Sequence, residues 1–356
     1  MSAPASQSLW SRLAAAGIVS GEMPAAPDSQ TPWYVRLMLG IAGLIAALFL
    51  LGAVITAFMF VVQSGVASVA VGGMLIVAAF AIFRAVPESD FGSMFALAVS
   101  FAGQALLLIG FFDLFGVGKG SHLPLAIAAV ESVLAAVMPN FIHRLVSACI
   151  GAVYFVLALG TFGLGVAAAG VLACATAYAW ANEARYAPVQ SIAIPIAYGI
   201  TLAYLYIEGL PADRWVTLAP VESIERPLPF TFWLAEILAG AALIATVAVL
   251  VKRAGWNLVE RRALLALAAA AAAALVSLRA SGVAGGLMIV LLAFANGNRV
   301  LLGLGIAGLL YYLSRYYYLL DMTLLGKAGV LAATGLVLLG ARWIVLRFVI
   351  VERAHA

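Results

Sequence analysis

Long runs of apolar residues separated by short polar breaks make up most of this chain. A continuous apolar run of about 18 residues predicts a membrane-spanning helix, whereas the strands of a membrane barrel would alternate polar and apolar positions. The expected fold is therefore all-α, a polytopic integral membrane protein with about twelve transmembrane helices, in a range of about 10–13. The runs fall at residues 37–62, 66–83, 91–112, 123–138, 145–162, 164–180, 189–207, 230–251, 263–278, 282–295, 300–320 and 322–346.

The polar breaks divide the chain into a long apolar domain and two tails. Residues 1–34 read as a cytoplasmic tail, in which Leu9, Trp10 and Leu13 recur at helical spacing and predict a short amphipathic helix before a proline-rich linker. Residues 35–347 form the transmembrane domain, and residues 348–356 form a second cytoplasmic tail. Most breaks between runs are only a few residues long, which predicts antiparallel helical hairpins.

The stretch 263–295 allows two interpretations. Its first run is mostly alanine and its second has only about 14 residues, or about 21 Å at 1.5 Å per residue. The two runs are either two tilted spans or a broken, partly re-entrant pair.

Composition and charge favour a membrane location and exclude a nucleic-acid-binding protein. The chain is 65% hydrophobic and only 10% charged, far from the values of soluble domains. The net charge of +4 comes from single or paired basic residues at the ends of runs, without a basic stripe. In an arrangement of twelve spans, most of these basic residues lie on the same side of the membrane as the N-terminus. Basic residues favour the cytoplasmic side, so both termini are expected to face the cytoplasm. The expected location is a bacterial inner membrane, with the lipid bilayer as the main partner.

Patterns typical of catalysis or of cofactor binding are absent from the sequence. It contains no HExxH, GxSxG or P-loop pattern, and its three histidines are scattered, so no catalytic residue, metal site or cofactor is expected. Cys149 and Cys174 lie within apolar runs and read as buried thiols. Gly303 to Gly308 matches GxGxxG, but within a membrane helix this pattern indicates close helix packing rather than a nucleotide site.

Charged residues inside the apolar runs are the main candidates for function, because each costs about 2.5–3.5 kcal/mol at the centre of a span. Glu131 lies in the middle of its run and is the candidate midplane residue. A second group lies near the predicted outer ends of the runs. The candidate outward-facing polar cluster comprises Glu236, Arg315, Asp321, Lys327, Tyr311 and Tyr318. The alternative is that the cations extend to the headgroups and the tyrosines form an interfacial belt.

The C-terminal part of the chain resembles a family of bacterial membrane proteins filed as domain of unknown function forty-four-oh-one. The resemblance rests on FANGNR from Phe294, YLSRYYY from Tyr312, TLLGK from Thr323, the closing Arg342-Trp343 and the opening PWYVR from Pro32. It implies a multi-span inner-membrane protein, commonly encoded near a second membrane protein with a GDYxxLxY motif. That second protein is the partner the resemblance implies; the motif itself is absent from this chain.

These observations predict a non-enzymatic component of a membrane or envelope assembly that works with a partner membrane protein. The alternative is a secondary transporter or flippase-like carrier of a small or amphiphilic substrate, for which Glu131 is the candidate residue. A membrane-embedded enzyme is the third interpretation.

Overall fold

A computed structural model describes residues 10–17, 59–85, 90–116, 122–210 and 228–319, together with isolated positions between residues 38 and 56. This part of the chain is helical, and residues 10–15 form a short helix in the N-terminal tail. The helices are α3 (Met59–Val62), α4 (Gly65–Ala85), α5 (Asp90–Phe115), α6 (His122–Val137), α7 (Phe141–Gly160), α8 (Gly165–Ala181), α9 (Gln190–Glu208), α10 (Pro229–Arg253), α11 (Arg261–Ser277), α12 (Val283–Ala295) and α13 (Arg299–Leu319), with the 3₁₀ segment η1 (Glu183–Val189) before α9.

Each apolar run expected between residues 66 and 320 coincides with one helix, from α4 to α13. Six helical segments of the described part are long and apolar enough to cross a membrane, and three shorter helices, α6, α8 and α12, are also apolar. The chain is therefore a multi-pass membrane protein by the length and composition of its helices. The runs expected at 37–62 and 322–346 lie mostly or wholly outside the described residues.

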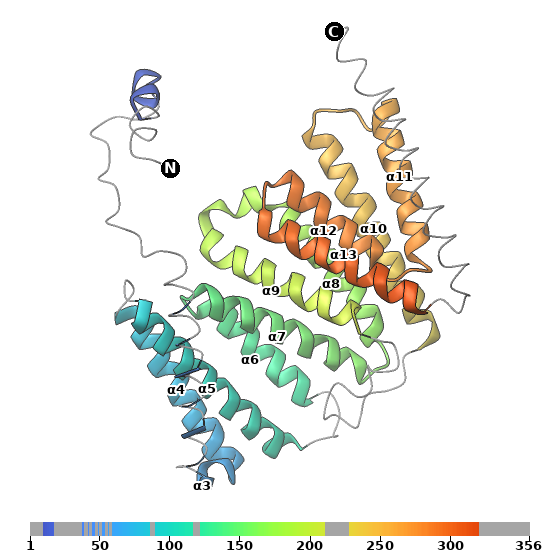
Figure 1. Cartoon of the computed structure of the whole chain (residues 1–356). Helices are drawn as coiled ribbons and strands as arrows, with labels where there is room; N and C mark the ends of the chain where they lie inside the picture. Colours follow the sequence, from blue (N-terminus) through green and yellow to red (C-terminus); the bar gives the residue numbers. More distant parts are fainter. Residues whose placement is uncertain are drawn as a thin grey trace.

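The helices pack as a series of antiparallel pairs (Figure 1). The hairpin of α4 and α5 lies at one side, and α5 connects it to the pair of α6 and α7. Next come α9 and α8, and then α10, α12 and α13, with α11 at the far edge against α10. In the α4–α5 hairpin, a Cβ at Gly72 would lie 2.7 Å from the carbonyl oxygen of Gly103, so the two backbones touch.

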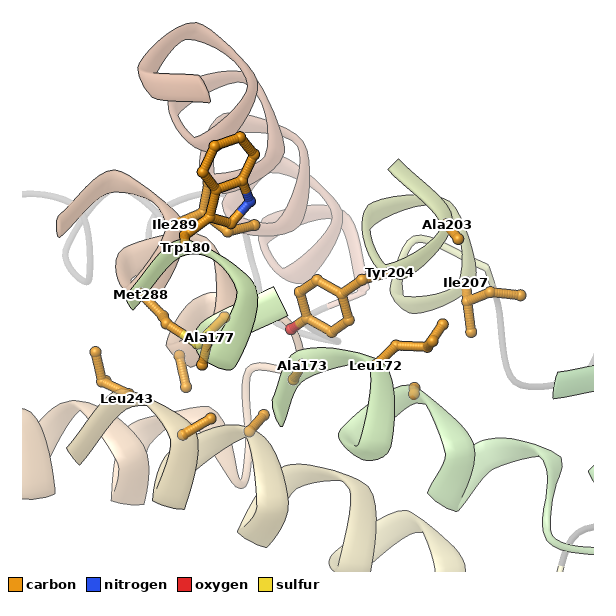
Figure 2. Packing of buried hydrophobic residues seen from close by; sticks show 14 of the residues in the cluster. Leu172, Ala173, Ala177, Trp180, Ala203, Tyr204, Ile207, Leu243, Met288 and Ile289 are labelled. Atoms are coloured by element: carbon orange, nitrogen blue, oxygen red, sulfur yellow. The ribbon is translucent and has the colours of Figure 1, made fainter. Parts of the chain in front are cut away.

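The main hydrophobic core lies between α8, α9, α10 and α12 (Figure 2). Trp180 is fully buried there, and its indole N–H donates to Thr201 Oγ1 at 2.9 Å. Tyr204 extends from α9 toward Ala173 and Ala177 of α8. Alanines dominate the facing surfaces, so the helix backbones approach closely.

The stretch 263–295 forms two separate helices, α11 and α12, joined by a tight turn. Gly282 has φ +84°, and a Cβ at this position would lie 2.7 Å from the ring of Tyr312. This left-handed conformation next to an aromatic ring suits glycine. α12 has only 13 residues, about 20 Å at 1.5 Å per residue.

The GxGxxG segment lies within α13, as expected for helix packing rather than nucleotide binding. A Cβ at Gly305 would lie 2.9 Å from Val290 of α12, and a Cβ at Gly308 would lie 2.8 Å from Leu205 of α9. A Cβ at Gly303 would meet no atom of the described residues within 4 Å.

The turn between α12 and α13 ties four helices together at one end of the bundle. The Asn296 side chain donates to the carbonyl of Trp180 at 2.8 Å and to Glu183 Oε2 at 2.7 Å, and it accepts from Arg253 at 3.2 Å. Asn298 caps α13 by accepting from the amide of Leu301, and it also accepts from the hydroxyl of Tyr198 in α9.

Candidate functional site

The candidate site lies at the opposite end of the bundle from the Asn296 turn, where several helix ends meet. α9 ends there at Glu208, α11 ends at Ser277, and the short turn to α12 follows. α10 contributes Glu236 from its second turn, and α13 contributes residues 311–315. Antiparallel packing of neighbouring helices brings these ends to the same side.

Two carboxyl groups form the centre of this site. The Glu208 carboxyl group lies close enough to that of Glu236 to interact electrostatically with it, although the two residues lie on different helices. Glu236 also accepts from Ser277 Oγ at 2.8 Å. Two neighbouring carboxylates repel each other, so a proton or a cation bound between them is favoured. We refer to Glu208 and Glu236 as the carboxyl pair.

Side chains of α13 satisfy the last carbonyl groups of α9. The Tyr312 hydroxyl donates to the carbonyl of Leu205 at 3.0 Å, and the Tyr311 hydroxyl donates to that of Gly209 at 2.9 Å. Arg315 Nη1 donates to the carbonyl of Glu208 at 3.2 Å. The final carbonyls of a helix have no partner within the helix, and a cation near them is also favoured by the helix dipole. α13 therefore caps α9.

Arg315 and Tyr204 complete the electrostatic surroundings of the carboxyl pair. The guanidinium of Arg315 interacts favourably with the Glu208 carboxylate. Tyr204, one helical turn before Glu208, is fully buried and interacts electrostatically with both Glu208 and Glu236. Its hydroxyl has no hydrogen-bond partner among the described residues. Buried hydroxyl groups rarely lack a hydrogen-bond partner, so the Tyr204 hydroxyl is an unusual feature of the interior of the site.

The structure brings three of the six residues of the predicted cluster to the end of α9. Glu236 interacts electrostatically with Glu208, while Arg315 and Tyr311 donate to the carbonyls of Glu208 and Gly209, respectively. Tyr318 is 80% exposed, with its ring edge-on to Tyr317. Asp321 and Lys327 lie outside the described residues.

The tyrosines of α13 divide between two environments rather than forming a single belt. Tyr312 is only 2% exposed and donates to α9, whereas Tyr318 is largely exposed. Arg315 bends to the end of α9.

Glu131 belongs to a second polar group, between α5, α6 and α7. It is 3% exposed and accepts from Gln104 Nε2 at 3.1 Å. Gln104 also donates to Ser147 Oγ at 2.8 Å, and Ser147 Oγ lies 3.4 Å from His143 Nδ1. On the other side of the ring, His143 Nε2 lies 2.7 Å from Ser100 Oγ. We call Ser100, Gln104, Glu131, His143 and Ser147 the α5–α7 network.

Glu208 and most of the α5–α7 network are not among the residues that stand out in the sequence. Glu208 ends its apolar run and a polar loop follows it, although Tyr204 precedes it on the same helical face. His143 is one of three scattered histidines, although Asn140 just before it is an N-cap residue and starts α7. Gln104 and Ser147 are neutral, so they stand out only as polar residues within otherwise apolar runs.

Three apolar grooves lie between the described helices, and the third borders Glu131, since Gly151 lines it and a Cβ at Gly151 would lie 3.3 Å from Glu131 Cβ. The first, between α10, α11 and α12, has a volume of about 450 Å³ and is lined in part by Leu243, Trp256 and Leu287. The second lies between α8 and α10, and the third lies beside α6, α7 and α9. Neither Glu131 nor the carboxyl pair lines any of these three grooves.

Among the described residues, no group of three or more His, Cys, Asp or Glu side chains is arranged to hold a metal ion. Cys149 and Cys174 are free and partly buried.

Comparison with known proteins identifies a family. No curated protein and no solved structure matches the chain. The model of the family described as "Domain of unknown function (DUF4401)" matches residues 32–348, nearly the whole chain. This protein is therefore a multi-pass member of the DUF4401 family.

Proposed function

We propose that this protein is a secondary carrier that exchanges a proton for a monovalent cation at the carboxyl pair. The observation that carries the proposal is the electrostatic interaction between the Glu208 and Glu236 carboxyl groups within an apolar helical bundle. Ionisable residues at membrane depth are costly, and proteins that keep them commonly use them for ion or proton pathways.

The charge balance of the site supports one monovalent cation at a time. With both carboxyl groups ionised and Arg315 beside Glu208, the three side chains carry a net charge of −1. One proton neutralises this charge, and so does one sodium ion. Carboxylate oxygens and the hydroxyl of Ser277 supply oxygen ligands of the kind that hard cations prefer. Binding of sodium would therefore displace a proton held by the carboxyl pair.

The proposed membrane arrangement is about twelve spans with both termini in the cytoplasm of a bacterial cell, the bilayer being the inner membrane. The coincidence of α4 to α13 with the expected runs supports this arrangement. The basic residues of the α10–α11 connection, Lys252, Arg253, Arg261 and Arg262, also support it, because such residues favour the cytoplasmic side. In this arrangement the carboxyl pair faces outward.

The test is sodium–proton exchange in liposomes that contain the purified full-length protein and an internal pH dye. After a pH gradient has been imposed, external sodium chloride should dissipate the gradient. Glu236→Gln and Glu208→Gln should each reduce this response to that of protein-free liposomes, because an amide cannot release a proton or neutralise a cation.

Glu260→Gln is the matched control. Glu260 lies in the exposed α10–α11 connection and accepts from the amide of Asn257, far along α10 from Glu236. This variant should exchange at the wild-type rate. Exchange at the wild-type rate in the two carboxyl-pair variants would contradict the proposal.

A second candidate function is a non-enzymatic component of a membrane or envelope assembly with a partner membrane protein, such as the GDYxxLxY protein. The groove between α10, α11 and α12 favours it, because Ala266, Ala269, Ala270 and Ala273 of α11 line that groove. Alanines four residues apart allow a second apolar helix to approach closely. Recovery of the GDYxxLxY protein with this chain, combined with no sodium-dependent response, would favour assembly over transport.

A further inference from the structure

We propose that the groove between α10, α11 and α12 binds an anionic phospholipid, with an acyl chain in the groove and the phosphate at the start of α11. This inference concerns different residues from the carboxyl pair and does not depend on sodium–proton exchange.

The groove is apolar along its length and opens to the outside of the described bundle. Leu243 and Val247 of α10 line it, together with alanines of α11 and Leu287 of α12, around a volume of about 450 Å³. Two further lining residues, Leu291 and Trp256, are 36% and 38% exposed. Because lipid tails are as apolar as such a groove, packing alone cannot select one lipid, and the selection must come from the headgroup.

The end of α10 places an aromatic side chain at one end of the groove. Gly255 has φ +75°, and the amides of Gly255 and Trp256 donate to the carbonyls of Lys252 and Val251 at 3.0 Å and 3.2 Å. This pair of hydrogen bonds is the Schellman motif, in which the residue after the glycine packs back on the last turn of the helix. Val251 and Trp256 both line the groove. Tryptophan favours the membrane–water interface, where its indole N–H can reach a headgroup.

The start of α11 offers backbone donors at the same end of the groove. α11 begins at Arg261, and its N-cap residue Glu260 makes no side-chain hydrogen bond to the helix. The Glu260 carboxylate instead accepts from the amide of Asn257 at 2.8 Å. The first amides of a helix have no partner within the helix, and together with the helix dipole they favour a bound phosphate.

Basic side chains add charge complementarity to these amides. Residues 252–262 include four basic residues and one acidic residue, so their net charge is 4 − 1 = +3. Arg262 precedes the groove-lining Ala266 and Ala269 by four and seven residues, so it lies on the same face of α11. Basic clusters beside membrane helices attract anionic headgroups. An apolar groove with a cationic end therefore matches the two parts of an anionic phospholipid.

The test is native mass spectrometry of the purified full-length protein, titrated with phosphatidylglycerol or with phosphatidylcholine that carries the same acyl chains. The wild type should bind phosphatidylglycerol more tightly. Arg261→Gln combined with Arg262→Gln should weaken phosphatidylglycerol binding about thirtyfold, or about fivefold for each basic residue near an anionic headgroup, and leave phosphatidylcholine binding unchanged. Arg279→Gln, at an exposed position just after the opposite end of α11, is the matched control and should keep the preference.

A second pair of variants tests the groove itself. Ala269 is exposed and lines the groove, so the ring introduced by Ala269→Phe would fill the space of the acyl chain and weaken the binding of both lipids. Ala268→Phe is the control, because Ala268 is also exposed but does not line the groove. If Ala269→Phe does not fold, Ala269→Leu replaces it.

Equal affinities of the wild type for the two lipids would overturn the proposal. A phosphatidylglycerol preference with unchanged affinity in Ala269→Phe would also overturn it, because the basic residues alone would then account for the binding. The groove cannot hold a lipid and the partner helix of the second candidate function at once. A partner protein whose binding is lost in Ala269→Phe but kept in the double arginine variant would assign the groove to that helix and overturn the lipid proposal.

Discussion

Among the described glycines, Gly285 leaves the least room for a Cβ, and the obstacle is Tyr204. The Tyr204 hydroxyl lies against the first turn of α12, and a Cβ at Gly285 would lie only 1.7 Å from its oxygen. Tyr204 is fully buried and extends from α9 toward α8 (Figure 2). Glycine at position 285 is therefore required by the aromatic side chain rather than by backbone conformation.

We expect Gly285→Ala to lower the free energy of unfolding by about 1–3 kcal/mol, because overpacking forces side chains or backbone to shift. The measurement is the thermal unfolding midpoint in mild detergent. Gly303→Ala in α13 is the control, since a Cβ there meets no atom of the described residues within 4 Å. A change equal to that of the control would show that the contact can relax at no cost.

The residues of the site differ in how far the sequence reveals them. Glu131, Glu236 and Arg315 could be selected because a charge within an apolar run is conspicuous. Glu208 could not, because it ends its run and is followed by a polar loop. Ser100, Gln104 and Ser147 carry no charge, and only the packing of α5 against α7 shows that they meet.

At the scale of elements, the cap that α13 places on the end of α9 explains much of the tyrosine cluster. Tyr311, Tyr312 and Arg315 each donate to a carbonyl at the end of α9. Unsatisfied carbonyls are especially costly in an apolar environment, so this cap stabilises the helix that holds Glu208. Two segments that carry the family resemblance therefore hold helices together. YLSRYYY supplies Tyr312 and Arg315 to the end of α9. FANGNR ties α8, α10 and α12 at the other end of the bundle.

We expect Tyr312→Phe to destabilise the protein by about 1–3 kcal/mol, because the carbonyl of Leu205 loses its partner in a buried place. The ring and its packing remain. Hydrogen–deuterium exchange should accelerate in the last turn of α9, near Glu208. Tyr316→Phe, at a half-exposed position of the same helix, should leave exchange there unchanged. Equal protection in both variants would mean that the cap contributes nothing to α9.

At the scale of the whole molecule, the positions of the helices were readable from the sequence, but their packing was not. Polar breaks such as Asn296 to Asn298 mark the ends of the runs clearly. The faces of a helix such as α8 are all apolar, since protein interior and lipid select similar residues. The sequence therefore carries no signal that α8 packs on α10, or that α7 packs on α9.

The proposed orientation makes a labelling prediction in a variant whose two native cysteines are replaced by alanine. Phe162→Cys, in the exposed turn after α7, should react with a membrane-impermeant maleimide in intact spheroplasts. Asn257→Cys, in the exposed α10–α11 connection, should react only after permeabilisation. The reverse pattern would place the N-terminus and the carboxyl pair on the opposite sides from those proposed.

The cap on α9 also bears on how the chain is made. Tyr312 follows Leu205 by 107 residues, so α9 is synthesised and inserted long before its donors exist. Until then, its last carbonyls must remain near the lipid headgroups, where water can reach them. We therefore expect α9 to reach its final depth, and the site around Glu208 to close, only after α13 has been synthesised.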